Sequence, residues 1–366
     1  LTERSEKETE ELRTKVSWIA YKQQFFSSIL ISDNYFLNAH IDAEKVHDSK
    51  KYLKHFKSNI ALPYKGAPKE KLDMRFYFGP NHYQTLNKYD IGIEKIIPLG
   101  WGIFGWVNRF AIIPVFNFLG SFMSSYGLII LILTILIKLV LFPLTYKSYV
   151  SSAKMRVMKP QLEELLKKIP KDKSMERQQK SMEYYKKVGV NPMGGCLPMV
   201  LQMPILIAMF RFFPSSIELR QKSFLWADDL SSYDAIISWT GDIPLVSQFY
   251  GNHISLFTLL MTISTIIYTR INQQQMGDTS AQMPGMKYMM YLFPVMMLFW
   301  FNNYASGLSY YYFIANIITF AQMYAIKRFV DDKAILKKLS ETKKKPIKKS
   351  SFLAKLEKRA REQAKT

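Results

Sequence analysis

Acidic side chains are absent from the places where this sequence is most apolar. Asp and Glu together number 29 among 366 residues, yet none lies in the five long apolar runs of the chain. The five histidines also lie away from the middle of these runs. Proton and ion relays inside a membrane normally use Asp, Glu or His. The sequence therefore argues against a pump or a proton-coupled carrier.

Cysteine is almost absent as well. The single Cys196 excludes an internal disulfide and any metal site built from several cysteines, and beside Gly194 and Gly195 it is best interpreted as a small packing residue. No Ser–His or Cys–His pair is available at membrane depth for nucleophilic catalysis, so we expect neither an enzyme nor a cofactor. The chain starts at Leu1 without a Met or a signal-peptide pattern, and we expect a further segment upstream of it.

Long apolar runs and very basic segments alternate along the chain, which has a formal net charge of +21. A helix needs roughly 20 apolar residues to span a bilayer. The sequence therefore predicts an α-helical membrane protein with a five-helix transmembrane core at 123–328. The predicted spans are 126–146, 193–213, 252–271, 286–304 and 307–326.

The residues before this core predict two further units. Residues 1–99 mix charged and aromatic side chains and suit short strands near 60–62 and 74–78, so we expect the C-terminal part of a larger β-sandwich. Residues 100–122 are apolar and aromatic with only Arg109 charged, which favours an amphipathic interfacial helix slightly over a further span.

The distribution of positive charge predicts the orientation. The segment 147–190 carries twelve Lys and Arg residues, whereas 214–251 has only Arg220 and Lys222, and the tail 329–366 is again rich in Lys. Positive charge favours the cytoplasmic side. With five spans, the N-terminal domain and 214–251 then lie outside, and 147–190 and the tail lie in the cytoplasm.

Segment 147–190 has the pattern of a helical hairpin. Apolar residues recur at spacings of three and four through 155–169, a turn follows at 170–173, and Met175, Met182, Tyr185 and Val188 mark a second helix. Pro160 should start a new helix or kink the first one. Gly189 is a reasonable residue to end the second helix.

Lys138 is the candidate functional residue, because it is a cation inside an apolar run. Such a lysine costs roughly 2.5–3.5 kcal/mol on insertion scales. One interpretation is a side chain that snorkels to the headgroups; the other is a cationic site in a hydrated groove. Thr134 lies on the same side of its helix, and Gln202 lies in the second span. The last span adds a polar stripe of Ser309, Tyr312, Asn316 and Thr319. The polar side of the first span and this stripe of the last span, together with an unpaired cation, favour the groove over helix–helix contacts alone.

The basic tail carries a cluster of lysines that allows two interpretations. Its members are Lys343, Lys344, Lys345, Lys348 and Lys349. They suit either attraction to anionic lipid or docking on the phosphates of RNA, and charge alone does not separate the two.

One stretch of the sequence resembles a known family. VNPMGGCLPMVLQMPI, at 190–205, is similar to the signature of the YidC membrane insertases and their mitochondrial Oxa-type and chloroplast Alb-type relatives. Residues 126–155, 217–231 and 305–319 carry supporting matches. The N-terminal domain resembles that of the bacterial form, which has a periplasmic β-sandwich and one more N-terminal span.

The resemblance implies a multi-pass protein of the bacterial inner membrane that inserts and helps to fold nascent membrane proteins, alone or beside the Sec translocon. It implies a hydrophilic groove between five helices, open to the cytoplasm and to the lipid bilayer and closed outside. Lys138 matches the basic residue of that groove, which is normally Arg, while Thr134 and Tyr312 match its polar positions. The interfacial helix matches 100–122 and the hairpin matches 151–188.

The resemblance also implies that the tail contacts the ribosome, as in some members. Lysine in place of arginine keeps the charge but loses the planar fork that captures a carboxylate through two bonds. From the residues alone, a channel or carrier that uses the same polar cavity stays an alternative, and so does a scaffold for other membrane complexes.

Overall fold

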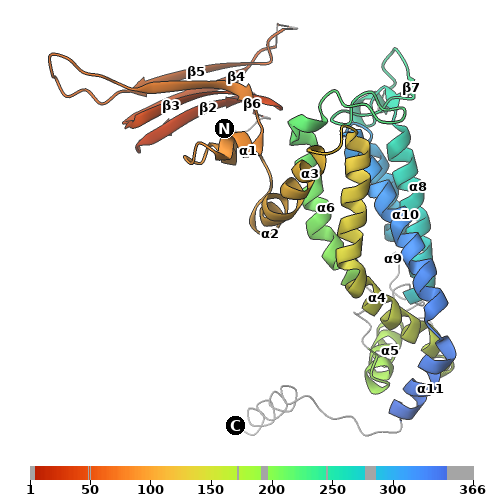
Figure 1. The fold of residues 1–366 in the computed structure, drawn as a ribbon. Coiled ribbons are helices and arrows are strands. Elements are labelled where there is room, and N and C mark those ends of the chain that lie inside the picture. The colour runs from red at the N-terminus through yellow and green to blue at the C-terminus, as the bar shows by residue number, and fades with distance from the viewer. Residues whose placement is uncertain are drawn as a thin grey trace, which may run out of the picture.

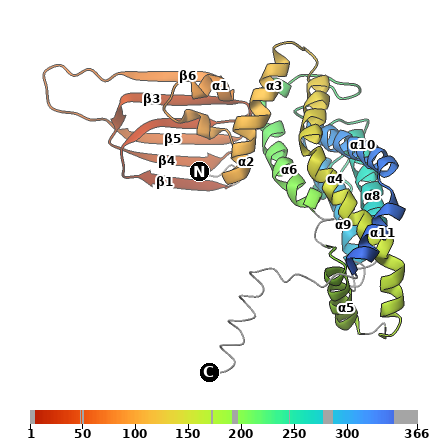
Figure 2. The ribbon, with the colours of Figure 1, turned by 60° about the horizontal axis from the view of Figure 1, so that its bottom comes forward.

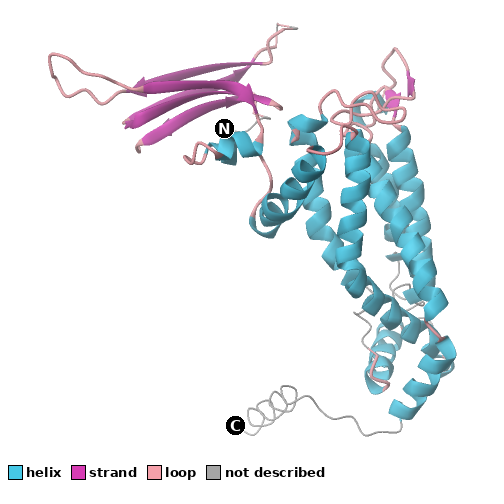
Figure 3. Cartoon of the chain, in the orientation of Figure 1, coloured by secondary structure: helices cyan, strands magenta, loops and turns pink. Residues whose placement is uncertain are grey.

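The computed structural model describes residues 5–47, 49, 51–170, 173–190, 197–244, 246–276 and 286–343. Two antiparallel sheets lie at the N-terminal end of the molecule, and a group of long helices forms the rest (Figures 1 and 3). The architecture therefore combines a β-rich domain with a helical core, as the sequence predicts.

Each sheet has three strands. The first has the order β1-β4-β5, built from β1 (Lys7–Leu12), β4 (Asn38–Lys45) and β5 (Lys54–Ala61). The second has the order β2-β3-β6, built from β2 (Val16–Lys22), β3 (Phe26–Phe36) and β6 (Met74–Pro80). The strands expected near 60–62 and 74–78 correspond to β5 and β6.

Strand β3 has both of its faces covered, because successive side chains of a strand point to opposite sides. Phe36 packs with Ile19 and with Ala39 of the other sheet, so the two sheets contact each other through an apolar layer. Ile29 and Ile31 belong instead to the cluster that continues into the helical part. This strand therefore joins the β domain to the rest of the chain.

The segment that follows β6 is helical rather than extended. It contains α1 (Tyr83–Asn87) and the 3₁₀ turn η1 (Ile93–Ile96), whose fully buried Leu86 and Ile93 lie in the same cluster as Ile29 and Ile31. The indole nitrogen of Trp18 donates to the carbonyl of Ile91 at 3.0 Å. The predicted β-rich unit at 1–99 thus contains strands only as far as Pro80 within the described residues.

The predicted interfacial segment, 100–122, is helical from Gly102 to Gly120. It consists of α2 (Gly102–Val107), a π-helical turn η2 (Asn108–Ile112) and α3 (Ile113–Gly120), with α2 beside α6 (Figure 1). Asn108 is fully buried and donates to the carbonyls of Leu99 and Ala208 at 2.7 and 2.9 Å. These bonds fix the segment against α6. By length and composition it is apolar enough to cross a membrane, so its interfacial position stays a prediction.

The five apolar runs all form helices. Further helices extend the core at the end farthest from the sheets, which is called the inner end below. The core consists of α4 (Tyr126–Leu166), α6 (Leu197–Ser215), α8 (Leu256–Met276), α9 (Met286–Phe301) and α10 (Ser306–Phe329). The additional helices are α5 (Ser174–Lys187) and α11 (Asp332–Lys343). Of the described helices, α4 is also long and apolar enough to span a bilayer by itself.

The structure excludes one of the two alternatives for Pro160 and adds a helix at the inner end. Pro160 starts no new helix, because α4 continues through it to Leu166 and itself forms the first arm of the hairpin. The segment predicted as the basic tail, 329–366, begins with helix, since α10 reaches Phe329 and α11 follows. The positive φ of Gly189, 73°, is the conformation expected of a glycine that ends α5.

The opposite end of the core is closed by loops that surround a buried acid. Short elements lie here: η4 (Ile217–Leu219), β7 (Ile237–Ser238), α7 (Val246–Phe249) and β8 (His253–Ile254). Asp234 is 2% exposed and accepts bonds from the indole of Trp226 at 2.8 Å, the hydroxyl of Ser255 at 2.5 Å and the backbone N–H of Phe257 at 3.0 Å. Asp234 therefore anchors the loop to the start of α8.

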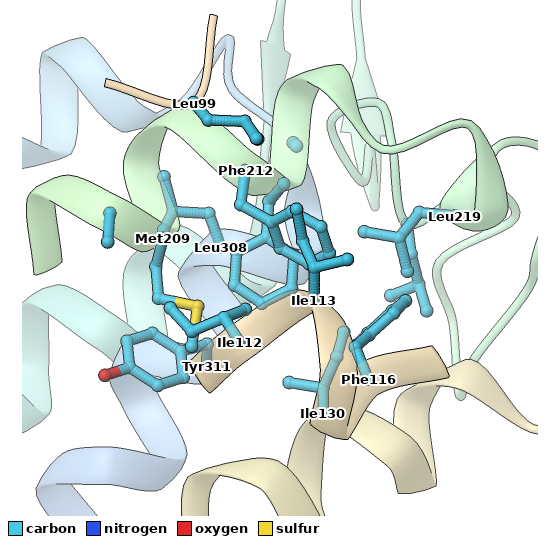
Figure 4. Close-up of a cluster of buried hydrophobic side chains, with 14 of the residues drawn as sticks. Leu99, Ile112, Ile113, Phe116, Ile130, Met209, Phe212, Leu219, Leu308 and Tyr311 are labelled. Atoms are coloured by element: carbon cyan, nitrogen blue, oxygen red, sulfur yellow. The ribbon is translucent and has the colours of Figure 1, made fainter. Parts of the chain in front are cut away.

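The main apolar cluster fills this half of the helical core. Figure 4 shows Ile112 and Phe116, Met209 and Phe212, and Leu308 converging from separate helices. The ring of Tyr311 lies at the edge of this group with its hydroxyl directed away from it (Figure 4). The cluster therefore ends where the polar side chains of the core begin.

Gly127 should not tolerate a side chain. A Cβ at this position would overlap the ring of Phe224, whereas a Cβ on Gly120 would meet only the hydroxyl of Tyr126 at 3.8 Å. We expect Gly127→Ala to lower the unfolding free energy by about 1–3 kcal/mol through overpacking, against a gain in helix propensity of up to about 1 kcal/mol. Thermal unfolding of the purified protein in detergent measures this. Gly120→Ala is the control, and equal melting temperatures for the two variants would contradict the prediction.

Candidate functional site

The ammonium group of Lys138 points into the helical core. The residue is only 9% exposed, and its Nζ donates to Oε1 of Gln202 at 3.2 Å and to Oγ1 of Thr319 at 3.0 Å. These acceptors come from α6 and α10, so three helices meet at one charge. The side chain is therefore bonded to its neighbours rather than extended along α4 toward headgroups.

Both acceptors of Lys138 are electrically neutral. Within the described ranges no carboxylate forms an ion pair with its ammonium. A buried charge normally has an opposite charge nearby, because removing an ion from water is costly. Lys138 keeps only partial compensation from two oxygen dipoles. No carboxylate among the described residues neutralises its charge.

Gln202 connects this site to a residue that the sequence did not single out. Its Nε2 donates to the hydroxyl of Tyr311 at 3.5 Å, and Tyr311 is fully buried with its ring 6.0 Å from that of Phe213. The sequence prediction named Tyr312 instead, which packs at the margin of the main apolar cluster. Residues 310–312 are all tyrosine, and the pattern alone does not tell which hydroxyl faces α6.

Thr134 lies one turn before Lys138 and is completely buried. Its hydroxyl donates to the carbonyl of Ile130 at 2.6 Å, in the same helix. Gln322, a second residue that the sequence analysis missed, donates from Nε2 to the backbone carbonyl of Lys138 at 3.1 Å. This bond ties α10 to α4 at the level of the site.

The polar stripe of α10 divides between two neighbours. Only Thr319 reaches Lys138; Asn316 donates from Nδ2 to the hydroxyls of Ser264 and Thr265 at 3.0 and 3.1 Å. Ser309 contacts the hydroxyl of Thr258 at 3.1 Å. Asn316 and Ser309 therefore join α10 to α8. The sequence signal for this contact was a row of hydroxyl residues at spacings of three and four that begins one residue before α8: Ser255, Thr258, Thr262, Thr265 and Thr269.

Several predicted residues lie outside the part of the chain that the structure describes. Lys343 is the last residue of α11, and the cluster continues beyond it with Lys344, Lys345, Lys348 and Lys349. Cys196 and the stretch 191–196 of the signature are also outside. Among the described residues, no group of three or more His, Cys, Asp or Glu side chains is arranged to hold a metal ion.

Comparison with known proteins connects this geometry to a family. The family model described as "60Kd inner membrane protein" matches residues 118–333, and the model "YidC periplasmic domain" matches residues 2–110. The chain belongs to the YidC family. The match of the first model covers every residue of the Lys138 site, and the second covers both sheets.

Curated YidC relatives align over nearly the whole chain. The protein named "Membrane protein insertase YidC" of Parabacteroides distasonis is 50% identical over 99% of this chain and 58% of that protein. Those of Azobacteroides pseudotrichonymphae and Bacteroides fragilis are 48% and 47% identical over 95% and 94% of the chain. The chain spans less than three fifths of the length of these relatives.

A solved YidC structure also aligns with this one. Its title is "Active YidC insertase crystal structure with the first transmembrane domain resolved". The two share 18% sequence identity at a TM-score of 0.44, over 87% of this chain and 79% of that one.

The bonds from Asn316 to α8 should stabilise the core measurably. Interhelical hydrogen bonds in membrane proteins average about 0.6 kcal/mol, so Asn316→Ala, which removes two, should lower the unfolding free energy by about 1 kcal/mol. Ile317→Ala is the control, because Ile317 is 42% exposed on the outside of α10. Unfolding in mixed micelles measures both, and an equal loss in the two variants would contradict the role of Asn316.

Proposed function

We propose that this chain forms the working core of a membrane protein insertase, which accepts segments of nascent membrane proteins and passes them into the lipid bilayer. One observation carries the proposal: a buried ammonium joins three helices and, among the described residues, is bonded only to neutral oxygens. The names of the relatives support it. The process needs no covalent step and no nucleotide.

The physical problem is the loss of water from the polar groups of a segment that crosses lipid. Each such group costs several kcal/mol when it is left unpaired in an apolar medium. In the proposed mechanism, a hydrophilic groove around Lys138, Gln202 and Thr319 extends partway through the bilayer and shortens the dry path. Lys138 attracts acidic residues of the incoming segment. Their carboxylates then replace the neutral acceptors of its ammonium for a time.

The apolar part of an incoming segment needs a different surface. Helix α9 has many exposed apolar side chains, with Leu292, Phe293 and Trp300 exposed by 52%, 54% and 71%. In the proposal, the outer faces of α6 and α9 receive the hydrophobic helix of the client before it moves into lipid. The polar and apolar parts of the client are then held by different helices of the core.

The proposed topology follows from charge. Helices α4, α6, α8, α9 and α10 cross the inner membrane, the sheets lie in the periplasm, and α5 and α11 lie in the cytoplasm. The segment from α2 to α3 lies along the periplasmic surface of the inner membrane, where the exposed Trp101 and Trp106 suit the interface between lipid and water. The insertase works alone or beside the Sec translocon.

The charge of Lys138 should matter most for clients with acidic translocated segments. We expect Lys138→Ala to reduce their insertion about tenfold, which corresponds to about 1.4 kcal/mol of lost attraction, and Lys138→Arg to retain it because the charge is kept. The measurement is protease protection of a tagged client in proteoliposomes.

Lys147→Ala is the matched control, since it removes the same charge from an exposed position of the same helix. A client whose translocated acids are replaced by amides should respond little to either variant. Equal insertion by wild type and Lys138→Ala would refute the charge-capture role. Solute flux through proteoliposomes with unchanged insertion would favour a channel or carrier instead.

The lysine cluster of the tail should strengthen association with ribosomes. Truncation after Lys343 removes most of the cluster and keeps both described cytoplasmic helices, α5 and α11. We expect ribosome co-sedimentation to fall in the truncated protein and, in the full chain, to weaken steeply as salt rises, because phosphate contacts release counterions. Unchanged co-sedimentation would leave only the contact with anionic lipid.

A further inference from the structure

Helix α11 is packed into the cytoplasmic hairpin. Leu339 is 5% exposed and, together with Ile335, lies in one apolar cluster with residues of both hairpin arms. The members of that cluster from the hairpin region are Met155, Met158, Leu162, Leu166, Tyr184, Tyr185, Val188 and Val190. The inner end of the molecule is therefore a three-helix unit of α4, α5 and α11 (Figure 2).

An ion pair marks the point where α11 meets α4. One guanidinium nitrogen of Arg156, Nη2, donates to both carboxylate oxygens of Asp332 at 3.0 and 2.9 Å. The two side chains are 30% and 48% exposed. Arg156 also bonds to the side chain of Tyr149, which packs with Met323 and Ile326 of α10. Arg156 thus connects the base of the hairpin with the end of α10 and the start of α11.

Two features of the chain around this ion pair bear on how α11 and the hairpin are held together. Only Val330 and Asp331 separate α10 from α11, so α11 has little freedom in where it begins. On the other side, Pro160 lacks the N–H that would bond to the carbonyl of Arg156, four residues earlier. The helix that carries the hairpin is weakened at the turn where α11 supports it.

We propose that Arg156 and Asp332 are positioning residues: through their ion pair, α11 holds the hairpin in one direction over the inner end of the core. Helix α6, the next described helix after the hairpin in the chain, carries Gln202 of the Lys138 site. A hairpin released from α11 therefore disturbs the entry of a client into the site. This consequence rests on the proposed insertase function; the support of the hairpin by α11 does not.

The test compares two neighbouring acids in the full chain in lipid nanodiscs. Asp332→Asn breaks the ion pair, whereas Asp331→Asn makes the same change of charge and keeps an oxygen to accept the N–H of Lys333, as Oδ1 of Asp331 does at 2.8 Å. We expect amide hydrogen exchange in the hairpin, 155–188, to rise about threefold in Asp332→Asn, the change expected when a partly exposed ion pair is lost. Exchange in Asp331→Asn should match wild type.

A second pair of variants tests the arginine. Arg156→Gln should reproduce the faster exchange, while Lys154→Gln, which removes a charge two residues away, should not. The charge swap Arg156→Asp with Asp332→Arg should restore slow exchange in the hairpin, a rescue that general destabilisation of α4 would not allow. We expect the melting temperature of each variant to match that of the wild type, which would show that the helical core itself stays folded.

Two results would overturn the proposal. Equal hairpin exchange in Asp332→Asn and Asp331→Asn would show that the ion pair does not hold the hairpin. Faster exchange with unchanged insertion of an acidic client would show that the position of the hairpin has no part in client entry. Because exchange is measured without a client, the first result is independent of whether Lys138→Ala impairs insertion.

Discussion

The bonds of Lys138 to Gln202 and Thr319 are the constraint around which the helical core is arranged. An ammonium inside an apolar bundle loses its water, and in the part of the chain that the structure describes two neutral oxygens replace part of it. For both oxygens to reach the same nitrogen, α4, α6 and α10 must keep a fixed rotation and depth relative to one another. The bond of Gln322 to the carbonyl of Lys138 fixes the depth of α10 in the same place.

The remaining polar contacts of the core keep this site apart from the rest. Asn316 and Ser309 face α8, so the α8–α10 contact is held by hydroxyl and amide bonds while the neighbouring face of α10 is left for Lys138. Toward the closed end, aromatic and aliphatic side chains replace polar ones, and the buried acid Asp234 is used to anchor a loop. Polar groups thus occupy two separate strips of one helix, each with its own partner.

Much of this arrangement was predictable from the sequence, and the rest depended on information that periodicity lacks. The five apolar runs and the contact of Lys138 with polar residues of two other helices follow from the rule that polar groups in apolar helices find partners. Asn316 and Thr319 lie only three residues apart, and a stripe does not reveal that its members face different neighbours. The choice between Tyr311 and Tyr312 likewise needs the rotation of α10.

The inner end was predicted less well because propensity and packing compete there. Pro160 is a helix breaker in an isolated chain, yet α4 continues through it, with Met158 and Leu162 on either side in an apolar cluster. The apolar residues of α11 lie among lysines in the sequence, and their partners are identified only with α4 and α5 in place. Tertiary contacts decided both segments.

The length of α4 has a mechanical meaning. Its 41 residues, at about 1.5 Å each, extend about 60 Å, twice the roughly 30 Å of hydrocarbon in a bilayer. In the proposed topology, about half of this length lies in the bilayer and carries Lys138, and the other half stands in the cytoplasm and carries Arg156. The lysine site and the hairpin are then two parts of one helix, and a bend at Pro143 or Pro160, which both lie inside it, would set the angle between them.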